Sequence, residues 1–151
     1  MSFQSILQSI VDDCGGGVGV ALMGRDGIAI GQALARVEAA RALEEEFGAA
    51  GVEFGRILDE IGKASDALGG GALREAVISL ARLVLIFHVV DDETFLVMAL
   101  LPDGNLGKAR YLLRRHLPAL RDQLRARGGA GRAGGTPWPS RFASWWCTGR
   151  T

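Results

Sequence analysis

The fold is decided by residues 84–101, VLIFHVVDDETFLVMALL. Two apolar runs of strand length, 84–90 and 95–101, are separated by three acidic residues and a threonine, which is the pattern of a β-hairpin. Neither run alternates apolar with polar residues, so both faces of this part of the sheet are expected to be covered. The stretch therefore predicts a sheet that is packed between helices.

The segments on either side predict an α+β sandwich, in which helices cover both faces of a five-stranded antiparallel sheet. Ser2 and Asn105 are expected to be N-caps of helices, and Gly24 to Gly27 form a tight hairpin turn. Pro118 is expected to bend the last helix. The predicted order is a helix over 3–11, strands over 18–23 and 28–32, a helix over 51–68, strands over 72–81, 84–90 and 95–101, and a helix that starts after Asn105.

Two segments depart from this pattern. Residues 33–47 are rich in Ala, Glu and Arg and predict a separate, loosely packed extra helix. Residues 128–151 consist largely of Gly, Ala, Arg, Pro and Ser, contain all three tryptophans and show no periodic apolar face. We therefore expect one domain over residues 1–127 and a disordered tail over 128–151.

The net charge of zero is unevenly distributed. Residues 125–151 carry five arginines and no acid, so residues 1–124 carry a net charge of −5. An acidic body argues against a nucleic-acid partner, which requires a basic face. The chain has no apolar run of about 18 residues and no N-terminal signal pattern, so we expect no membrane insertion and a cytoplasmic location.

Two motifs resemble ligand sites but do not support one. The glycine-rich residues 15–19 lack the Lys and Ser/Thr of a phosphate-binding loop and precede a strand rather than a helix. The acids Asp91, Asp92 and Glu93 are typical of a hairpin turn. We therefore expect neither a cofactor nor a metal site.

The chain also offers no nucleophile with a partner base. His88 lies in an apolar strand, where a structural role is expected, and His116 is expected to be exposed to solvent. Cys14 and Cys147 have no metal-ligand spacing and are expected to be free thiols. The sequence therefore predicts a protein that is not an enzyme.

Gly55 and Gly62 lie one heptad apart on the second predicted helix. A glycine inside a helix costs about 1 kcal/mol relative to alanine. Two interpretations remain: the helix tolerates a weak propensity, or the glycines allow a second helix to approach. A homodimer would supply that second helix.

The hairpin GVALMGRDGI over residues 19–28 and the helix start NLGKAR over 105–110, in this order and spacing, resemble the Roadblock/dynein-light-chain family. The resemblance covers about residues 3–124 and points to the bacterial branch that regulates small GTPases. It implies a profilin-like fold with the second helix on one sheet face and the first and last helices on the other. It also implies a homodimer that pairs third strands edge to edge, with an interface at Gly55, Gly62, Leu73, Glu75, Val77 and Ser79.

The same resemblance implies a regulator or positioning platform for a Ras-like small GTPase, which acts without donating an arginine to the nucleotide site. The expected partner surface is the outward side of the second helix, with Glu53, Arg56, Asp59, Glu60 and Lys63. Two alternatives remain open. One is a pure scaffold with no effect on GTP hydrolysis, and the other is a small-ligand sensor with a cavity lined by Phe87, His88 and Phe95.

Overall fold

The computed structural model describes residues 2–36 and 38–131. It confirms the predicted α+β architecture and the element order α-β-β-α-β-β-β-α. The elements are α1 (Phe3–Asp13), β1 (Gly17–Gly24), β2 (Ala29–Leu34), α2 (Glu38–Leu68), β3 (Glu75–Ser79), β4 (Val84–Val89), β5 (Thr94–Leu100) and α3 (Leu106–Gly131).

All five strands form one antiparallel sheet in the order β2-β1-β5-β4-β3. The predicted hairpin of residues 84–101 is present, and Val89 pairs with Phe95 next to its turn. In that turn Asp91 Oδ1 accepts hydrogen bonds from the Glu93 amide at 2.8 Å and the Thr94 hydroxyl at 2.7 Å. The first of the three acids therefore stabilises the turn itself.

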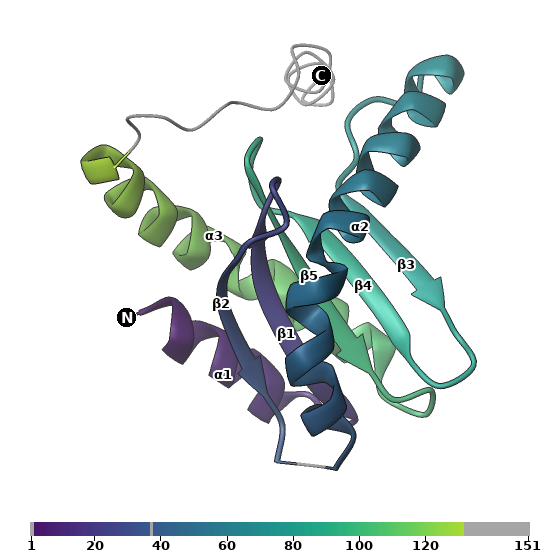
Figure 1. The fold of residues 1–151 in the computed structure, drawn as a ribbon, viewed down its shortest axis with the longest axis vertical. Helices are drawn as coiled ribbons and strands as arrows, with labels where there is room; N and C mark the ends of the chain where they lie inside the picture. Colours follow the sequence, from purple (N-terminus) through teal and green to yellow (C-terminus); the bar gives the residue numbers. More distant parts are fainter. Residues whose placement is uncertain (1, 37, 132–151) are drawn as a thin grey trace.

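The helices form two layers around the sheet (Figure 1): α1 and α3 cover one face and α2 covers the other. Successive strand residues point to opposite faces, so Ile86 is buried in the cluster with α1 and α3, whereas Phe87 is buried in the cluster with α2. The ring of Phe87 meets Phe54 edge to face, with centroids 5.3 Å apart. This double coverage explains why residues 84–101 are apolar without alternation.

The starts of α1 and α3 match the sequence prediction. The Ser2 hydroxyl accepts a hydrogen bond from the Ser5 amide at 3.2 Å, and Asn105 Oδ1 accepts one from the Lys108 amide at 3.0 Å, so both predicted N-caps are confirmed. Helix α3 contains Pro118 and continues to Gly131, past the proposed domain boundary at residue 127. The rest of the predicted tail, with its three tryptophans, lies outside the described residues.

The prediction for residues 33–47 was correct in that residues 38–47 are helical, but they do not form an additional helix. There is no separate helix: residues 33 and 34 complete β2, and residues 38–47 are the first turns of α2, which begins at Glu38 rather than at Gly51. Ala, Glu and Arg are strong helix formers, and they extend the helix although this part has a weak apolar stripe. The glycine at position 51 does not end the helix because α2 packs there against the β1–β2 turn.

Candidate functional site

The outer edge of β3 is the first candidate surface. Within the described part of the chain β3 is hydrogen-bonded to β4 only, so its other side is a sheet edge. Val77 is 40% exposed on the face shared with α3, while Ile78 packs on the α2 side. Leu80, just after the strand, is 50% exposed. An unpaired edge with apolar side chains beside it favours strand pairing with another chain.

The predicted interface residues do not all share this edge. Val77 and Ser79 are exposed on it, Leu73 packs in the α2-side cluster, and Glu75 forms an ion pair with Arg110 of α3. Gly55 lies against the β1–β2 turn, where an added Cβ would be 3.1 Å from the carbonyl oxygen of Arg25.

The glycines of α2 thus have an explanation that sequence reasoning did not consider. At Gly51 an added Cβ would overlap the Gly27 carbonyl oxygen, and Gly27 has a φ of +86° in the turn. Gly62 is buried within the chain. Close packing of α2 on its own sheet accounts for Gly51 and Gly55, so these two glycines are not evidence for a second helix.

The second candidate surface is the outward side of α2. Arg56 lies 3.4 Å from Glu53, and Lys63 lies 2.8 Å from Glu60. All four side chains are exposed, whereas Asp59 is half-buried. Such pairs one turn apart contribute about 0.2–0.5 kcal/mol each. The five predicted partner residues therefore lie on one helix, and the charges of four of them are available to solvent.

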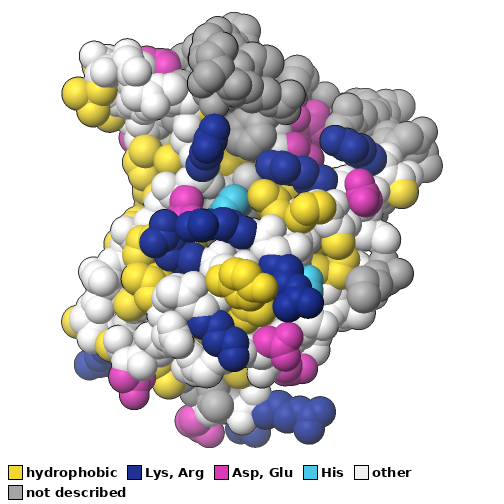
Figure 2. Space-filling model, turned by 180° about the vertical axis from the view of Figure 1, so that it is seen from behind, with side chains coloured by type: hydrophobic (Ala, Val, Ile, Leu, Met, Phe, Trp, Pro, Cys, Tyr) yellow, Lys and Arg dark blue, Asp and Glu magenta, His cyan; other side chains and the backbone are white. Residues whose placement is uncertain are grey.

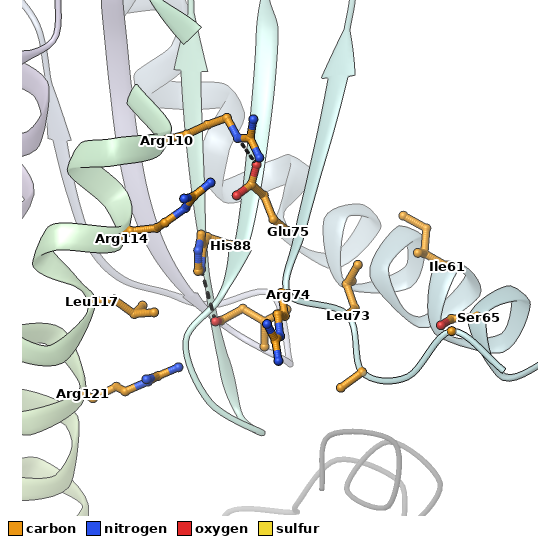
Figure 3. A pocket seen from close by; sticks show the side chains of 13 residues that line it. Ile61, Ser65, Leu73, Arg74, Glu75, His88, Arg110, Arg114, Leu117 and Arg121 are labelled. Carbon is orange, nitrogen blue, oxygen red and sulfur yellow. Dashed lines mark hydrogen bonds and ion pairs between the residues drawn. The ribbon is translucent and has the colours of Figure 1, made fainter. Parts of the chain in front are cut away.

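The third candidate is a hollow that sequence reasoning missed. A cavity of about 1020 Å³ opens between α3, β4, the start of β3 and the end of α2 (Figure 3). Figure 2 shows this side of the molecule, where Lys and Arg side chains gather around a histidine. The charged and titratable side chains that line the cavity are Arg74, Glu75, His88, Arg110, Arg114 and Arg121.

Two of these side chains, both arginines of α3, bond to groups outside their own helix. Arg110 Nε donates to Glu75, and Arg121 Nε donates to the Val90 carbonyl oxygen at 2.8 Å. His88 Nδ1 lies 3.4 Å from the Val89 carbonyl oxygen. The register between β3 and β4, which sets Glu75 opposite His88, brings these groups together.

His88 is buried, as a structural histidine is expected to be. Burial lowers the pKa of His88 from its ordinary value of 6.5, and the positive charges of Arg121 and Arg114 lower it further, against the opposing effects of the Val89 carbonyl and Glu75. The imidazole is therefore neutral at pH 7. His116, which was predicted to be exposed, is half-buried.

The glycine-rich connection between α1 and β1 packs closely against the loop that precedes α3. Gly16 has a φ of +83°, and an added Cβ there would overlap Gly104. The Gly16 carbonyl oxygen accepts a hydrogen bond from the Leu101 amide at 2.9 Å. The run therefore joins two loops at one end of the sheet, and this contact accounts for the glycine at position 16.

In residues 2–36 and 38–131, no group of three or more His, Cys, Asp or Glu side chains is arranged to hold a metal ion. Burial raises the pKa of the Cys14 thiol, opposed by the charge of Lys108. None of the helices in these ranges has the length and apolarity needed to cross a bilayer.

The chain is similar to several solved structures. MglC from Myxococcus xanthus is 30% identical, with a TM-score of 0.58 over 82% of this chain and 99% of MglC. A Roadblock/LC7 domain from Streptomyces avermitilis is 14% identical, with a TM-score of 0.69 over 83% of this chain and 99% of that domain. MglB from Myxococcus xanthus is 14% identical, with a TM-score of 0.70 over 82% of this chain and 94% of MglB.

No protein-family model matches the chain, and no curated protein matches it. The likeness to the Streptomyces domain and to MglB shows the fold, whereas the identity with MglC extends over nearly all of that protein. Together with the observed architecture, these comparisons establish that the chain belongs to the Roadblock/LC7 family.

Proposed function

We propose that the chain is a non-enzymatic, homodimeric regulator or adaptor of a Ras-like small GTPase. The observation that carries the proposal is the Roadblock fold with an unpaired β3 edge, in a chain 30% identical to MglC. The family resemblance implies both the dimer and the GTPase. The β3 edge is the candidate surface for the dimer, and the outward side of α2 is the candidate surface for the GTPase.

The dimer is proposed to form by antiparallel pairing of β3 with its copy. A two-fold pair of edge strands would satisfy the backbone groups on that side and continue the sheet across both chains. The exposed apolar side chains Val77 and Leu80 would be covered in the same step. Glu75 and Ser79 belong to this proposed interface through their position in β3, and Leu73 lies just before the strand.

The GTPase is proposed to bind the outward side of α2. This helix ends next to the start of β3, so pairing of two β3 strands would bring two copies of α2 onto one side of the joined sheet (Figure 1). Ile57, one turn from both Glu53 and Glu60, is 38% exposed and adds an apolar contact to the charged surface. A GTPase near the two-fold axis would block a second copy, so we expect one GTPase per dimer.

The proposal is tested by calorimetric titration of the Ras-like GTPases of the same cell, each loaded with a non-hydrolysable nucleotide. The test variant combines Arg56→Glu with Glu60→Lys. The matched control combines Arg115→Glu with Asp103→Lys, which reverses exposed charges on the other side. We expect binding to be lost only in the test variant, because complementary charges set the orientation of the complex.

The outcomes separate the alternatives. Equal affinity of the test variant and wild type removes α2 from the interface, and no binding to any GTPase removes the GTPase role. Where binding is found, the GTP hydrolysis rate is measured with and without the chain. Acceleration identifies an activating protein, and an unchanged rate identifies a positioning platform or scaffold.

A further inference from the structure

The two helices that flank the hollow carry opposite charge. Helix α3 contains seven basic residues and one acid, Asp122, whereas α2 contains eight acids and three basic residues. The positive side chains of α3 are not spread evenly. Arg110, Arg114 and Arg121 share one face, because they are spaced by four and seven residues. Figure 3 shows these three side chains directed from α3 toward β4 and β3.

This row spans a considerable distance. At a rise of about 1.5 Å per residue, the Cα atoms of Arg110 and Arg121 are about 16 Å apart along α3. Arg74 adds a fourth guanidinium from the loop that precedes β3. Between these charges the wall includes three apolar side chains that line the cavity, Leu73, Val89 and Leu117.

Part of this row is held in place before any ligand arrives. Glu75, whose side chain is 14% exposed, orients Arg110, and the Val90 carbonyl oxygen orients Arg121. Ordering a long side chain on binding costs about 0.5–1.5 kcal/mol, and anchored arginines have already lost much of that freedom. Arg114, between them, is exposed.

We propose that this hollow binds an extended, acidic peptide segment of a partner protein. Carboxylates of the segment meet the arginines, and intervening apolar side chains contact Leu73 and Leu117. An extended chain advances about 3.3 Å per residue, so about five residues cover the row. Arginine binds carboxylates through two parallel hydrogen bonds, which suits separate acidic side chains along a strand.

The arrangement favours carboxylates spread along a chain over a compact phosphate group. A single phosphate would reach only one part of a row of about 16 Å. The carboxylate of Glu75 in the wall also repels a concentrated negative charge. The chain's own residues 128–151 do not fit, because they carry three arginines and no acid. The proposal does not depend on the GTPase, whereas Leu73 and Glu75 belong both to the hollow and to the proposed dimer interface.

The test uses the full chain and fluorescein-labelled peptides of equal length. The probe alternates Glu with Leu, and its matched control alternates Gln with Leu. Fluorescence anisotropy is expected to show binding of the Glu peptide only. Arg114→Glu is expected to weaken that binding at least tenfold, because it replaces attraction by repulsion at the middle of the row. Arg115→Glu, one residue outside the hollow, is expected to leave it unchanged.

A second readout comes from His88, which lies in the wall of the hollow. Carboxylates bound beside the imidazole stabilise its charged form, so its pKa followed by NMR is expected to rise when the Glu peptide is present. Circular dichroism of Arg114→Glu establishes that the variant is folded.

The proposal is overturned by absent binding, by equal binding of the Gln peptide, by an Arg114→Glu variant that binds like wild type, or by an unchanged His88 pKa. Inorganic phosphate and a single-stranded oligonucleotide are included as competitors. If either displaces the Glu peptide at lower concentration than unlabelled peptide does, the hollow is a phosphate or nucleic-acid site instead.

Discussion

On α2 the charged side chains pair with one another, Glu53 with Arg56 and Glu60 with Lys63, within one exposed helix surface. On α3 the side chains of Arg110 and Arg121 instead bond to groups outside their own helix, namely Glu75 and the Val90 carbonyl oxygen. The two helices cover opposite faces of one sheet (Figure 1). They differ in the partners of their charged side chains.

The difference separates two kinds of charged surface. Charges paired within an exposed helix contribute little to folding, so the α2 surface can change its pattern to suit a partner at small cost in stability. Charges that connect α3 to β3 and β4 also position the strands beneath them. Replacing them is expected to lower stability as well as to change the surface. Mutations on the two helices should therefore have separable effects.

The largest expected effect comes from the core, where the two faces should behave alike. Leu58 on α2 and Leu113 on α3 are both fully buried. Truncation of either to Ala is expected to lower the free energy of unfolding by about 2–5 kcal/mol through lost burial and a cavity. Urea denaturation measures both variants. A loss below about 1 kcal/mol for only one would show that its helix is loosely packed.

The next effect concerns the β3 edge. Val77→Pro removes a backbone donor and is expected to convert the proposed dimer into a monomer, as measured by light scattering. Val77→Lys keeps the donor and places a charge on the edge, and it should also weaken the dimer while leaving the pairing with Ile86 intact. A dimer that survives both changes uses another surface.

A smaller effect directly compares the two kinds of charge. Glu75→Gln is expected to lower stability by about 1 kcal/mol, because it weakens a mostly shielded bond to Arg110. Glu53→Gln, which removes an exposed pair with Arg56, should change stability by less than about 0.5 kcal/mol. A double-mutant cycle with Arg110→Gln isolates the coupling. Equal losses of stability in Glu75→Gln and Glu53→Gln would show that the charged pairs of α2 and α3 contribute alike to folding.

The smallest effect is a pH dependence limited to the α3 side. Because the pKa of His88 is lower in the folded chain than its ordinary value of 6.5, the unfolded chain binds a proton first as the pH falls. Stability should therefore be highest above about pH 6.5 and decline on acidification below it. Thermal melts are measured from pH 7.5 down to pH 5.5, in pH steps on the order of half a unit. The melting temperature should fall less steeply with pH in His88→Gln than in His116→Gln.

The sequence contained enough information for the sheet, the helix order and both N-caps, since each rests on local patterns. Residues 84–101 show strands by their apolar runs, and Ser2 and Asn105 show helix starts by residue type. The first turns of α2 were mistaken for a separate helix because residues 38–47 lack a clear apolar stripe. The glycine at 51 added to this error, because the turn it contacts is distant in sequence.

The hollow between α3, β4, the start of β3 and the end of α2 could not be predicted from the sequence, for a different reason. Arg74 and Arg110 come together only through the β3–β4 register and the packing of α3 on the sheet. The spacing of Arg110, Arg114 and Arg121 on one helix face was a signal that the sequence did contain. Its meaning depended on knowing that this face lines an open hollow shared with β3 and β4.

The contact between Gly51 and the β1–β2 turn has a mechanical consequence. With no side chain between them, the helix backbone and the Gly27 carbonyl lie so close together that sliding or rotation of α2 against the hairpin would bring the two backbones into collision. A load applied to the exposed side of α2 is therefore transmitted directly into β1, which lies next to the middle strand of the sheet. A partner held there would be carried on a stiff support, and its displacement would move the whole sheet as one body.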